Sequence, residues 1–149
     1  MKRLWILFLF AIPAIGICQA PEGTNQISVA GLTFIQVVDS LVDRGYEIRW
    51  TDNNYKSVRT GFKEAPNPSG RGPSYVYVSI RIHVKGSTAL ITAKWYNAVF
   101  KATHVRTEPL DSELMPVIWS SGDAAQLAFK QIDNFAKSFG KDISYNTVQ

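Results

Sequence analysis

The chain contains few cysteines and histidines, and their scarcity excludes several kinds of site. Among its 149 residues there are one cysteine and two histidines. The cysteine, Cys18, lies in the N-terminal segment, so a domain that begins after it has neither a disulfide framework nor a thiolate metal site. His83 and His104 are far apart and do not show metal-ligand spacing. We therefore expect no bound metal and a fold stabilised by its hydrophobic core.

The chain also lacks the short motifs of common enzymes. It contains no Gly-x-Ser-x-Gly elbow and no His-Glu-x-x-His pair. The glycines of PSGRGPS (68–74) do not stand between a strand pattern and a helix pattern, as a phosphate-binding loop requires. Two acidic pairs, Asp39 with Asp43 and Asp111 with Glu113, fit a solvated surface. These absences predict a non-enzymatic protein without a cofactor, and a small hydrolase is the less favoured alternative.

Long apolar runs are confined to the N-terminus. Lys2 and Arg3 precede an uncharged run, residues 4–18, that holds 15 residues and includes Pro13. A helix that spans a bilayer needs about 20 apolar residues. The layout therefore predicts a secretory signal peptide over residues 1–18, removed on export, and no transmembrane segment in the rest of the chain.

The cleavage site of this signal peptide has two candidates. Cleavage after Cys18 and cleavage after Ala20 both leave small residues before the cut, and the product is a single domain over residues 19–149. Lipid attachment at Cys18 is the minority alternative, because Ile17 stands where lipoprotein signals carry a small residue. We expect a periplasmic or secreted protein.

The balance of charge is only slightly basic. The chain has 16 Lys and Arg against 12 Asp and Glu. Loss of Lys2 and Arg3 with the signal peptide leaves 14 against 12, a formal charge of +2. This small excess, together with export, predicts that nucleic acid is not a partner.

Two segments show helical periodicity. In TFIQVVDSLVDRG, Thr33 and Gln36 form a capping-box pattern and Gly45 suits a helix end, so a helix is expected between Thr33 and Gly45. A second helix is expected from an Asp123 cap to Gly140. Its apolar stripe consists of Ala128, Ile132, Phe135 and Phe139.

Between the helices, YEIRWT and SVRTGFK predict two strands. A connecting loop of odd length pairs Trp50 with Val58, which keeps apolar side chains on one face. The apolar face then holds Tyr46, Ile48, Trp50, Val58 and Phe62. The opposite face holds Glu47, Arg49, Thr51, Arg59 and Lys63.

The segment SYVYVSIRIHVKGSTALITAKWYN, residues 74–97, predicts a hairpin around a two-residue Gly-Ser turn. In this register apolar residues pair with apolar residues on one face, for example Ile82 with Ile91. The other face pairs Tyr77 with Tyr96. Because both strands favour the same register, the hairpin is the most strongly specified local structure in the chain.

The order of these elements predicts an α+β fold. We expect a helix, a four-stranded antiparallel meander and a second helix, with NQISVAG (25–31) as an additional short N-terminal strand. The proline-rich segment 64–74 interrupts the meander, and we interpret it as a flexible, solvated connection rather than a lid. Since each helix has one apolar stripe, both helices are expected to pack on the apolar face of the sheet.

An exported chain with GYEIRWTDNNYKSVRTGFKE, ALITAKWYN and FAKSFGKDISY in this order resembles small secreted domains of unknown function from Bacteroidetes-type bacteria, including those with a TBP-like fold. The resemblance covers residues 27–145 as a pattern of topology. It implies an envelope protein of that fold class and no catalytic residues. A fold name of this kind does not imply DNA binding.

The candidate site is the face of the sheet turned away from the helices. Its cations and aromatic rings suit an anionic or carbohydrate ligand, held by charge-assisted hydrogen bonds and stacking. We therefore expect a binding or adaptor domain. An ordinary solvated face and a structural interface with another envelope protein are the alternatives, since Tyr and Arg are also enriched at interfaces. The candidate binding residues are Arg49, Arg59, Tyr77, Arg81, His83, Lys94 and Tyr96.

Overall fold

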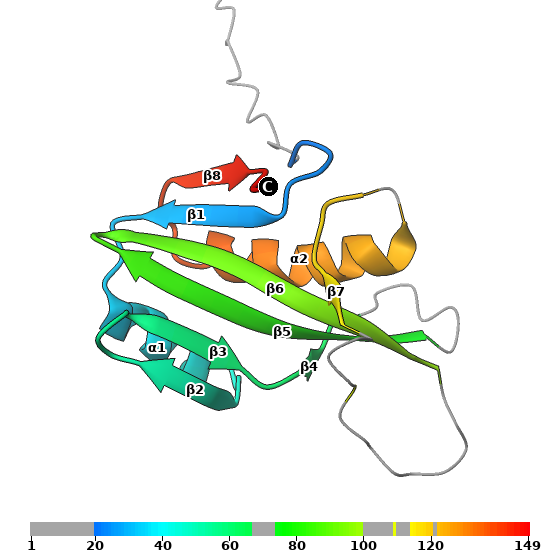
Figure 1. Ribbon diagram of the computed structural model, residues 1–149, viewed down its shortest axis with the longest axis horizontal. Coiled ribbons are helices and arrows are strands. Elements are labelled where there is room, and N and C mark those ends of the chain that lie inside the picture. Colours follow the sequence, from blue (N-terminus) through cyan, green and yellow to red (C-terminus); the bar gives the residue numbers. More distant parts are fainter. Residues whose placement is uncertain (1–19, 67–73, 100–108, 110–113, 121) are drawn as a thin grey trace, which may run out of the picture.

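The computed structural model describes residues 20–66, 74–99, 109, 114–120 and 122–149 (Figure 1). The predicted signal peptide, His104 and most of the predicted loop 64–74 lie outside the described residues. The elements follow the order β1 (Gln26–Ala30), α1 (Phe34–Asp43), β2 (Ile48–Asp52), β3 (Ser57–Thr60), β4 (Lys63–Glu64), β5 (Ser74–Lys85), β6 (Thr88–Val99), β7 (Met115–Pro116), α2 (Asp123–Lys137) and β8 (Ile143–Asn146).

The hairpin of β5 and β6 forms the centre of the sheet, and its predicted register is confirmed. Ile82 pairs with Ile91 and Tyr77 pairs with Tyr96, within one uninterrupted ladder from Ser74 to Lys85. Gly86 takes a φ of 63°, a left-handed conformation that a residue with a Cβ atom adopts only with strain. In Figure 1 these two strands cross the whole molecule, and the shorter strands flank them.

The sheet is larger than the predicted four strands. It has eight strands in the order β2-β3-β5-β6-β1-β8, with β4 paired to β5 and β7 paired to β6. The N-terminal strand is present as β1, which lies between β6 and β8. The sequence did not predict β8, and it pairs antiparallel with β1 from Gln26 opposite Asn146 to Val29 opposite Ile143. Asn25 closes this end, because its side chain accepts a hydrogen bond from Val148 N and donates one to Val148 O, both at 2.8 Å.

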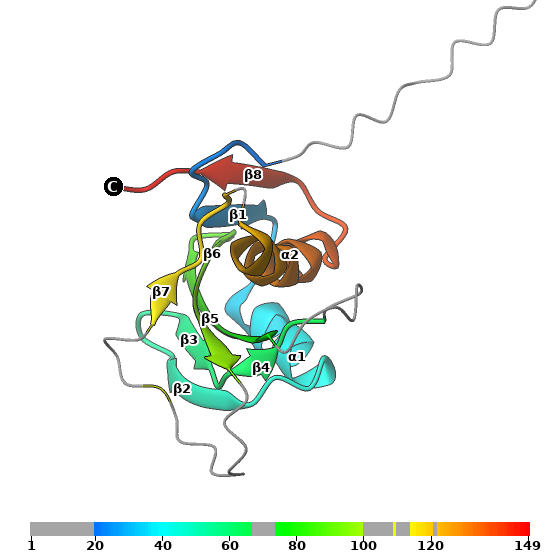
Figure 2. The same ribbon diagram turned by 90° about the vertical axis from the view of Figure 1, so that its right-hand side faces the viewer.

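Both helices lie on the same side of the sheet, and β7 lies on the other side (Figure 2). The core fills the space between helices and sheet. Its fully buried members include Ile27, Val29, Val37, Leu41, Ile80, Ile82, Ile91, Phe129 and Ile132. Within the described residues, neither helix has the length and apolar character needed to cross a membrane.

The helix boundaries follow their capping signals at α1 but not at α2. Thr33 is the N-cap of α1, and its side chain and that of Gln36 form both hydrogen bonds of the capping box. The predicted cap of α2, Asp123, is instead its first helical residue, because Gly122 occupies the N-cap position without a side-chain bond. There its carboxylate still lies in the first turn, where a negative charge is favourable.

The predicted pairing of the second and third strands is wrong. Asp52 pairs with Ser57, so the connecting loop has the four residues 53–56 instead of an odd number, and Trp50 lies opposite Arg59 instead of Val58. A β-bulge further along β2 also interrupts the alternation that the sequence suggests. Ile48 lies opposite Thr60 and Trp50 lies opposite Arg59, so Arg49 is the extra residue of this bulge. Trp50 therefore shares the face of Arg59, opposite the helices, and is 43% exposed.

The second bulge lies between β3 and β4. Arg59 pairs with Arg81 and Lys63 pairs with Val78, so residues 60–62 stand opposite only 79 and 80. The extra residue reverses the alternation that the sequence suggests. Phe62 contacts Tyr96 on the face away from the helices, with ring centroids 5.0 Å apart. Lys63 turns toward the helices, where its Nζ lies 4.6 Å from the centre of the Tyr46 ring.

Tyr46 connects this bulged region to α2. Its ring contacts Phe135 edge-on at 5.8 Å, and its hydroxyl accepts a hydrogen bond from the Gln131 side chain at 2.9 Å. Burial raises the pKa of Tyr46, against smaller opposing effects of the Gln131 hydrogen bond and the Arg44 charge. The phenol therefore stays protonated at neutral pH and serves as a structural contact.

Thr60 holds the second bulge, and this contact generates a stability prediction. The Thr60 hydroxyl accepts a hydrogen bond from Ile80 N at 2.9 Å, and Thr60 O accepts one from Ser79 Oγ at 2.7 Å. Thr60→Val keeps the shape of the side chain but leaves the buried Ile80 N–H without its acceptor. We expect a loss of about 1–3 kcal/mol in the free energy of unfolding, measured by urea titration.

Thr51→Val is the matched control, because Thr51 is exposed on β2. It is expected to change the free energy of unfolding by less than about 0.5 kcal/mol. Equal stabilities of the two variants would show that the Thr60 contact does not hold the bulge.

Candidate functional site

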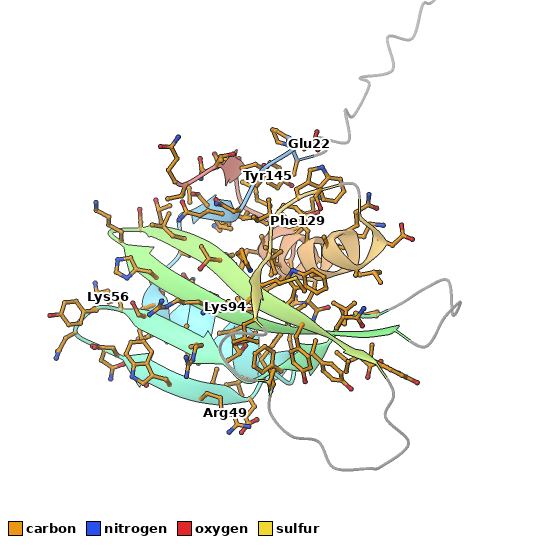
Figure 3. The ribbon with its side chains drawn as sticks, turned by 45° about the vertical axis from the view of Figure 1, so that its right-hand side comes forward. Glu22, Arg49, Lys56, Lys94, Phe129 and Tyr145 are labelled. Carbon is orange, nitrogen blue, oxygen red and sulfur yellow. The ribbon has the colours of Figure 1, made fainter. Side chains whose placement is uncertain are left out.

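A groove crosses the face of the sheet opposite the helices. Its volume is about 680 Å³, and it extends over β2, β3, β5 and β6 to the beginning of β1 and the segment around β7. Figure 3 labels two of its basic residues, Arg49 on β2 and Lys94 on β6. The lining residues are Asn25, Gln26, Arg49, Arg59, Thr60, Gly61, Phe62, Ser79, Arg81, Thr92, Ala93, Lys94, Pro109, Leu114, Pro116, Val117 and Val148.

Two arginines lie directly opposite each other in this groove. Arg59 on β3 and Arg81 on β5 are partners in the antiparallel ladder, which brings their Cα atoms to about 4.5–5.5 Å. We call Arg59 and Arg81 the arginine pair. Lys94 lies diagonally across from Arg81, because it follows the partner of Arg81 by two residues along β6. Such diagonal neighbours are about 7–8 Å apart.

All the charged side chains among the described lining residues of the groove are basic. None of the described lining residues is acidic. The ion pairs between described residues are Arg49 with Glu47 and Lys137 with Asp133, so no described carboxylate pairs with Arg59, Arg81 or Lys94. Like charges directly opposite each other on a sheet are destabilising. Among the described residues, the arginine pair is therefore a place where two like charges lie close together.

Arg49 reaches the groove through the bulge of β2. Its Nε lies 3.1 Å from Glu47 Oε1, and because both side chains are largely exposed this ion pair contributes little to stability. Gly61 makes room for the Glu47–Arg49 ion pair. A Cβ atom at Gly61 would come within 2.9 Å of Glu47 Oε2 and 3.2 Å of Arg49 Nε. Gly61 N also donates to Glu47 O at 2.7 Å. A glycine in the bulge thus lets Arg49 lie close against the strand.

The side chains at the base of the groove are polar, and their hydrogen-bonding groups are paired within the protein. Thr60 and Ser79 are buried, and both hydroxyls form hydrogen bonds with backbone carbonyls. In the described part of the chain, every buried side-chain nitrogen and oxygen has a partner. Polar recognition of a ligand therefore falls to the exposed cations above this base rather than to the base itself.

One side of the groove is apolar. We call Leu114, Pro116, Val117 and Val148 the apolar wall. β7 holds most of it against β6: Val117 N donates to Ala93 O at 2.9 Å, and the indole N–H of Trp95 donates to Pro116 O at 3.2 Å. Val148 follows β8 and is fixed by the reciprocal bonds with Asn25.

The structure brings four of the seven predicted binding residues together. Arg49, Arg59, Arg81 and Lys94 line the groove. The other three, Tyr77, Tyr96 and His83, are not among its lining residues.

The predicted aromatic surface is a stack rather than an open platform. The rings of Tyr77 and Tyr96 face each other, with centroids 5.2 Å apart and planes inclined by 15°. Phe62 packs edge-on against Tyr96 and connects this stack to the groove. His83 Nδ1 forms a hydrogen bond of 2.9 Å with Ser57 Oγ on the neighbouring strand. These contacts favour the cations over the tyrosines as the recognition elements.

The sequence did not predict the base or the apolar wall. The sequence did contain a signal for the base of the groove, namely Gly61. An isolated glycine within a strand pattern often marks a β-bulge. No comparable signal exists for β7, which has only two residues, Met115 and Pro116.

The like charges of the arginine pair predict an unusual effect on stability. Arg81→Gln removes the repulsion with Arg59, so at low ionic strength, in a buffer without multivalent anions, we expect the free energy of unfolding to rise by about 0.2–1 kcal/mol. The gain is expected to shrink as sodium chloride screens the charges. Urea titrations at two salt concentrations measure both effects.

Lys85→Gln is the matched control. Lys85 is exposed on the same face of β5, but its ladder partner is the uncharged Thr88. It is expected to leave stability nearly unchanged at both salt concentrations. A destabilising effect of Arg81→Gln at low salt would contradict the account of repulsion.

No model of a protein family matches the chain, and none of the curated proteins searched matches it significantly. Inferences about function therefore depend on the chemistry of the groove.

Proposed function

We propose that this protein is an exported, non-catalytic binding module whose groove holds an anionic ligand. The observation that carries the proposal is the arginine pair, two guanidinium groups on directly opposed residues with no carboxylate among the described lining residues. An anion between them replaces repulsion with charge-assisted hydrogen bonds, which are about twice as strong as neutral ones.

An anionic ligand fits the groove better than a neutral carbohydrate. Neutral sugars are commonly held by stacking on exposed aromatic rings, whereas Tyr77 and Tyr96 stack on each other beside the groove. Arginine presents a planar fork of donors that matches carboxylate and phosphate oxygens. The described lining offers such donors from Arg49, Arg59 and Arg81, with Lys94 as an additional point charge.

Export is the second part of the proposal. It rests on the N-terminal sequence, in which Lys2 and Arg3 precede the uncharged run 4–18. An exported domain meets the anionic components of the cell envelope or its surroundings rather than cytoplasmic nucleic acid. The ligand is therefore proposed to be an anion of the periplasmic or extracellular space.

Binding of pyrophosphate tests the proposal that the groove holds an anionic ligand. Pyrophosphate has enough charge to bridge the arginine pair, so we expect saturable binding by isothermal titration calorimetry at low salt. Arg59→Gln and Arg81→Gln each remove charge-assisted bonds of about 1.5–3 kcal/mol, which corresponds to a loss of affinity of roughly tenfold or more. Affinity is also expected to fall with added sodium chloride.

Lys85→Gln again provides the control, since Lys85 lies on the same face outside the groove lining. The affinity of the Lys85→Gln variant for pyrophosphate is expected to stay within about twofold of that of the wild-type protein. If all three variants bind equally well, the arginine pair is not the anion site.

Export predicts a shortened mature protein. When the full chain is expressed in a bacterium that recognises its signal, we expect the periplasmic fraction to contain a product that begins at Gln19 or Pro21. Intact-mass measurement identifies the product. An unprocessed chain in the cytoplasm would contradict export, and a diacylglyceryl mass on Cys18 would show lipid anchoring instead of simple cleavage.

A further inference from the structure

Charge is distributed unevenly along the groove. Arg49, Arg59 and Arg81 occupy the part that lies on β2, β3 and β5. Beyond β6 the described lining consists of the amides of Asn25 and Gln26 and of the apolar wall. Lys94 lies at the transition, because it pairs with Pro116 of β7. The groove thus has a cationic half and an uncharged, largely apolar half.

The apolar half is exposed at Pro116 and Val148, and it is held in place on the sheet. Pro116 is exposed and Val148 is 50% exposed, so both offer apolar surface to a ligand. Backbone bonds from Val117 to Ala93 and from Trp119 to Thr24, at 2.9 and 2.7 Å, hold this segment on the sheet. A surface that is already ordered loses little conformational freedom when it binds.

The groove is also larger than a simple anion needs. Its volume of about 680 Å³ lies within the range of about 300–1,000 Å³ that is typical of pockets for organic ligands. An inorganic anion at the arginine pair would leave the apolar wall uncovered. A ligand that fills both halves has a negative group at one end and a hydrocarbon part at the other.

We propose that the groove binds an amphiphilic anion, whose charged group contacts the arginine pair and whose hydrocarbon chain lies against the apolar wall. This proposal rests on the proposed function, because it assigns the same anion site. It adds the chemical class of the ligand: an acyl or alkyl chain that ends in a phosphate or carboxylate. The apolar wall then provides affinity, and the arginine pair fixes the orientation.

A series of alkyl phosphates tests the class. Methyl, butyl, hexyl and octyl phosphate carry the same charged group and differ only in chain length. Titrated by calorimetry below their micellar concentrations, they are expected to bind with increasing affinity, by up to about fourfold for each methylene that is buried. Arg81→Gln is expected to weaken every member of the series by a similar factor.

Variants of the apolar wall separate the two halves of the groove. Leu114→Asn and Val148→Asn are expected to reduce the affinity for octyl phosphate severalfold and to leave methyl phosphate and pyrophosphate unchanged. Ile35→Asn is the matched control, because Ile35 is 71% exposed on α1, on the other side of the sheet. It is expected to leave the whole series unchanged. Urea titration confirms that each variant is folded.

The outcomes distinguish this inference from the proposed function. Equal affinity for all chain lengths, with pyrophosphate still bound, would overturn the amphiphilic class and leave the anion site standing. A chain-length effect that survives both wall variants would place the hydrocarbon elsewhere and would also overturn the inference. If neither the alkyl phosphates nor pyrophosphate bind, both proposals fail.

Discussion

The pairing of β5 with β6 determines where the other elements of this protein lie. Twelve residues of each strand form one uninterrupted ladder. Each strand is then flanked by two short segments, β3 and β4 on β5, and β1 and β7 on β6. Because side chains alternate along a strand, this one register directs Ile80 and Ile82 toward the helices and Ser79 and Arg81 into the groove.

The two bulges modify this regular pattern at the position where the groove forms. The bulge of β2 places Arg49 beside Gly61, and the bulge after β3 turns Phe62 away from the helices. The same bulge sends Lys63 to the helix side, where it covers the Tyr46 ring. As a result the charged residues on the groove side come from β2, β3, β5 and β6, and the only described acid that contacts them is Glu47.

Sequence patterns predicted the parts of the fold that depend on local alternation. The hairpin register followed from the match of apolar residues in two adjacent strands, and the start of α1 followed from the Thr33–Gln36 capping box. The same alternation placed Arg59, Arg81 and Lys94 on one face. The pairing of β2 with β3 was wrong, because the loop between them has the four residues 53–56 where the alternation favoured an odd number. In addition, the inserted residue of each bulge moves the side chains beyond it to the opposite face.

The remaining features depend on contacts between residues that are distant in the sequence. β8 has four residues, and the bond from Asn146 to Ser28 on β1 spans 118 positions. The apolar wall depends on two-residue β7 and on a bond from Trp95 to Pro116. Neither segment is long enough to show a period of its own. The tyrosines were correctly paired across the hairpin, but their stacking on each other depends on side-chain conformation, which the pattern does not specify.

The central claim is that the arginine pair is the contact point for an anion, and the guanidinium groups themselves can report it. The most direct measurement is nuclear magnetic resonance of the arginine Nε–Hε groups during titration with pyrophosphate. We expect saturable shifts for Arg59 and Arg81, whereas Arg44, at the end of α1 and outside the groove lining, stays unchanged. Shifts of equal size in all arginines, or none in Arg59 and Arg81, would contradict the account.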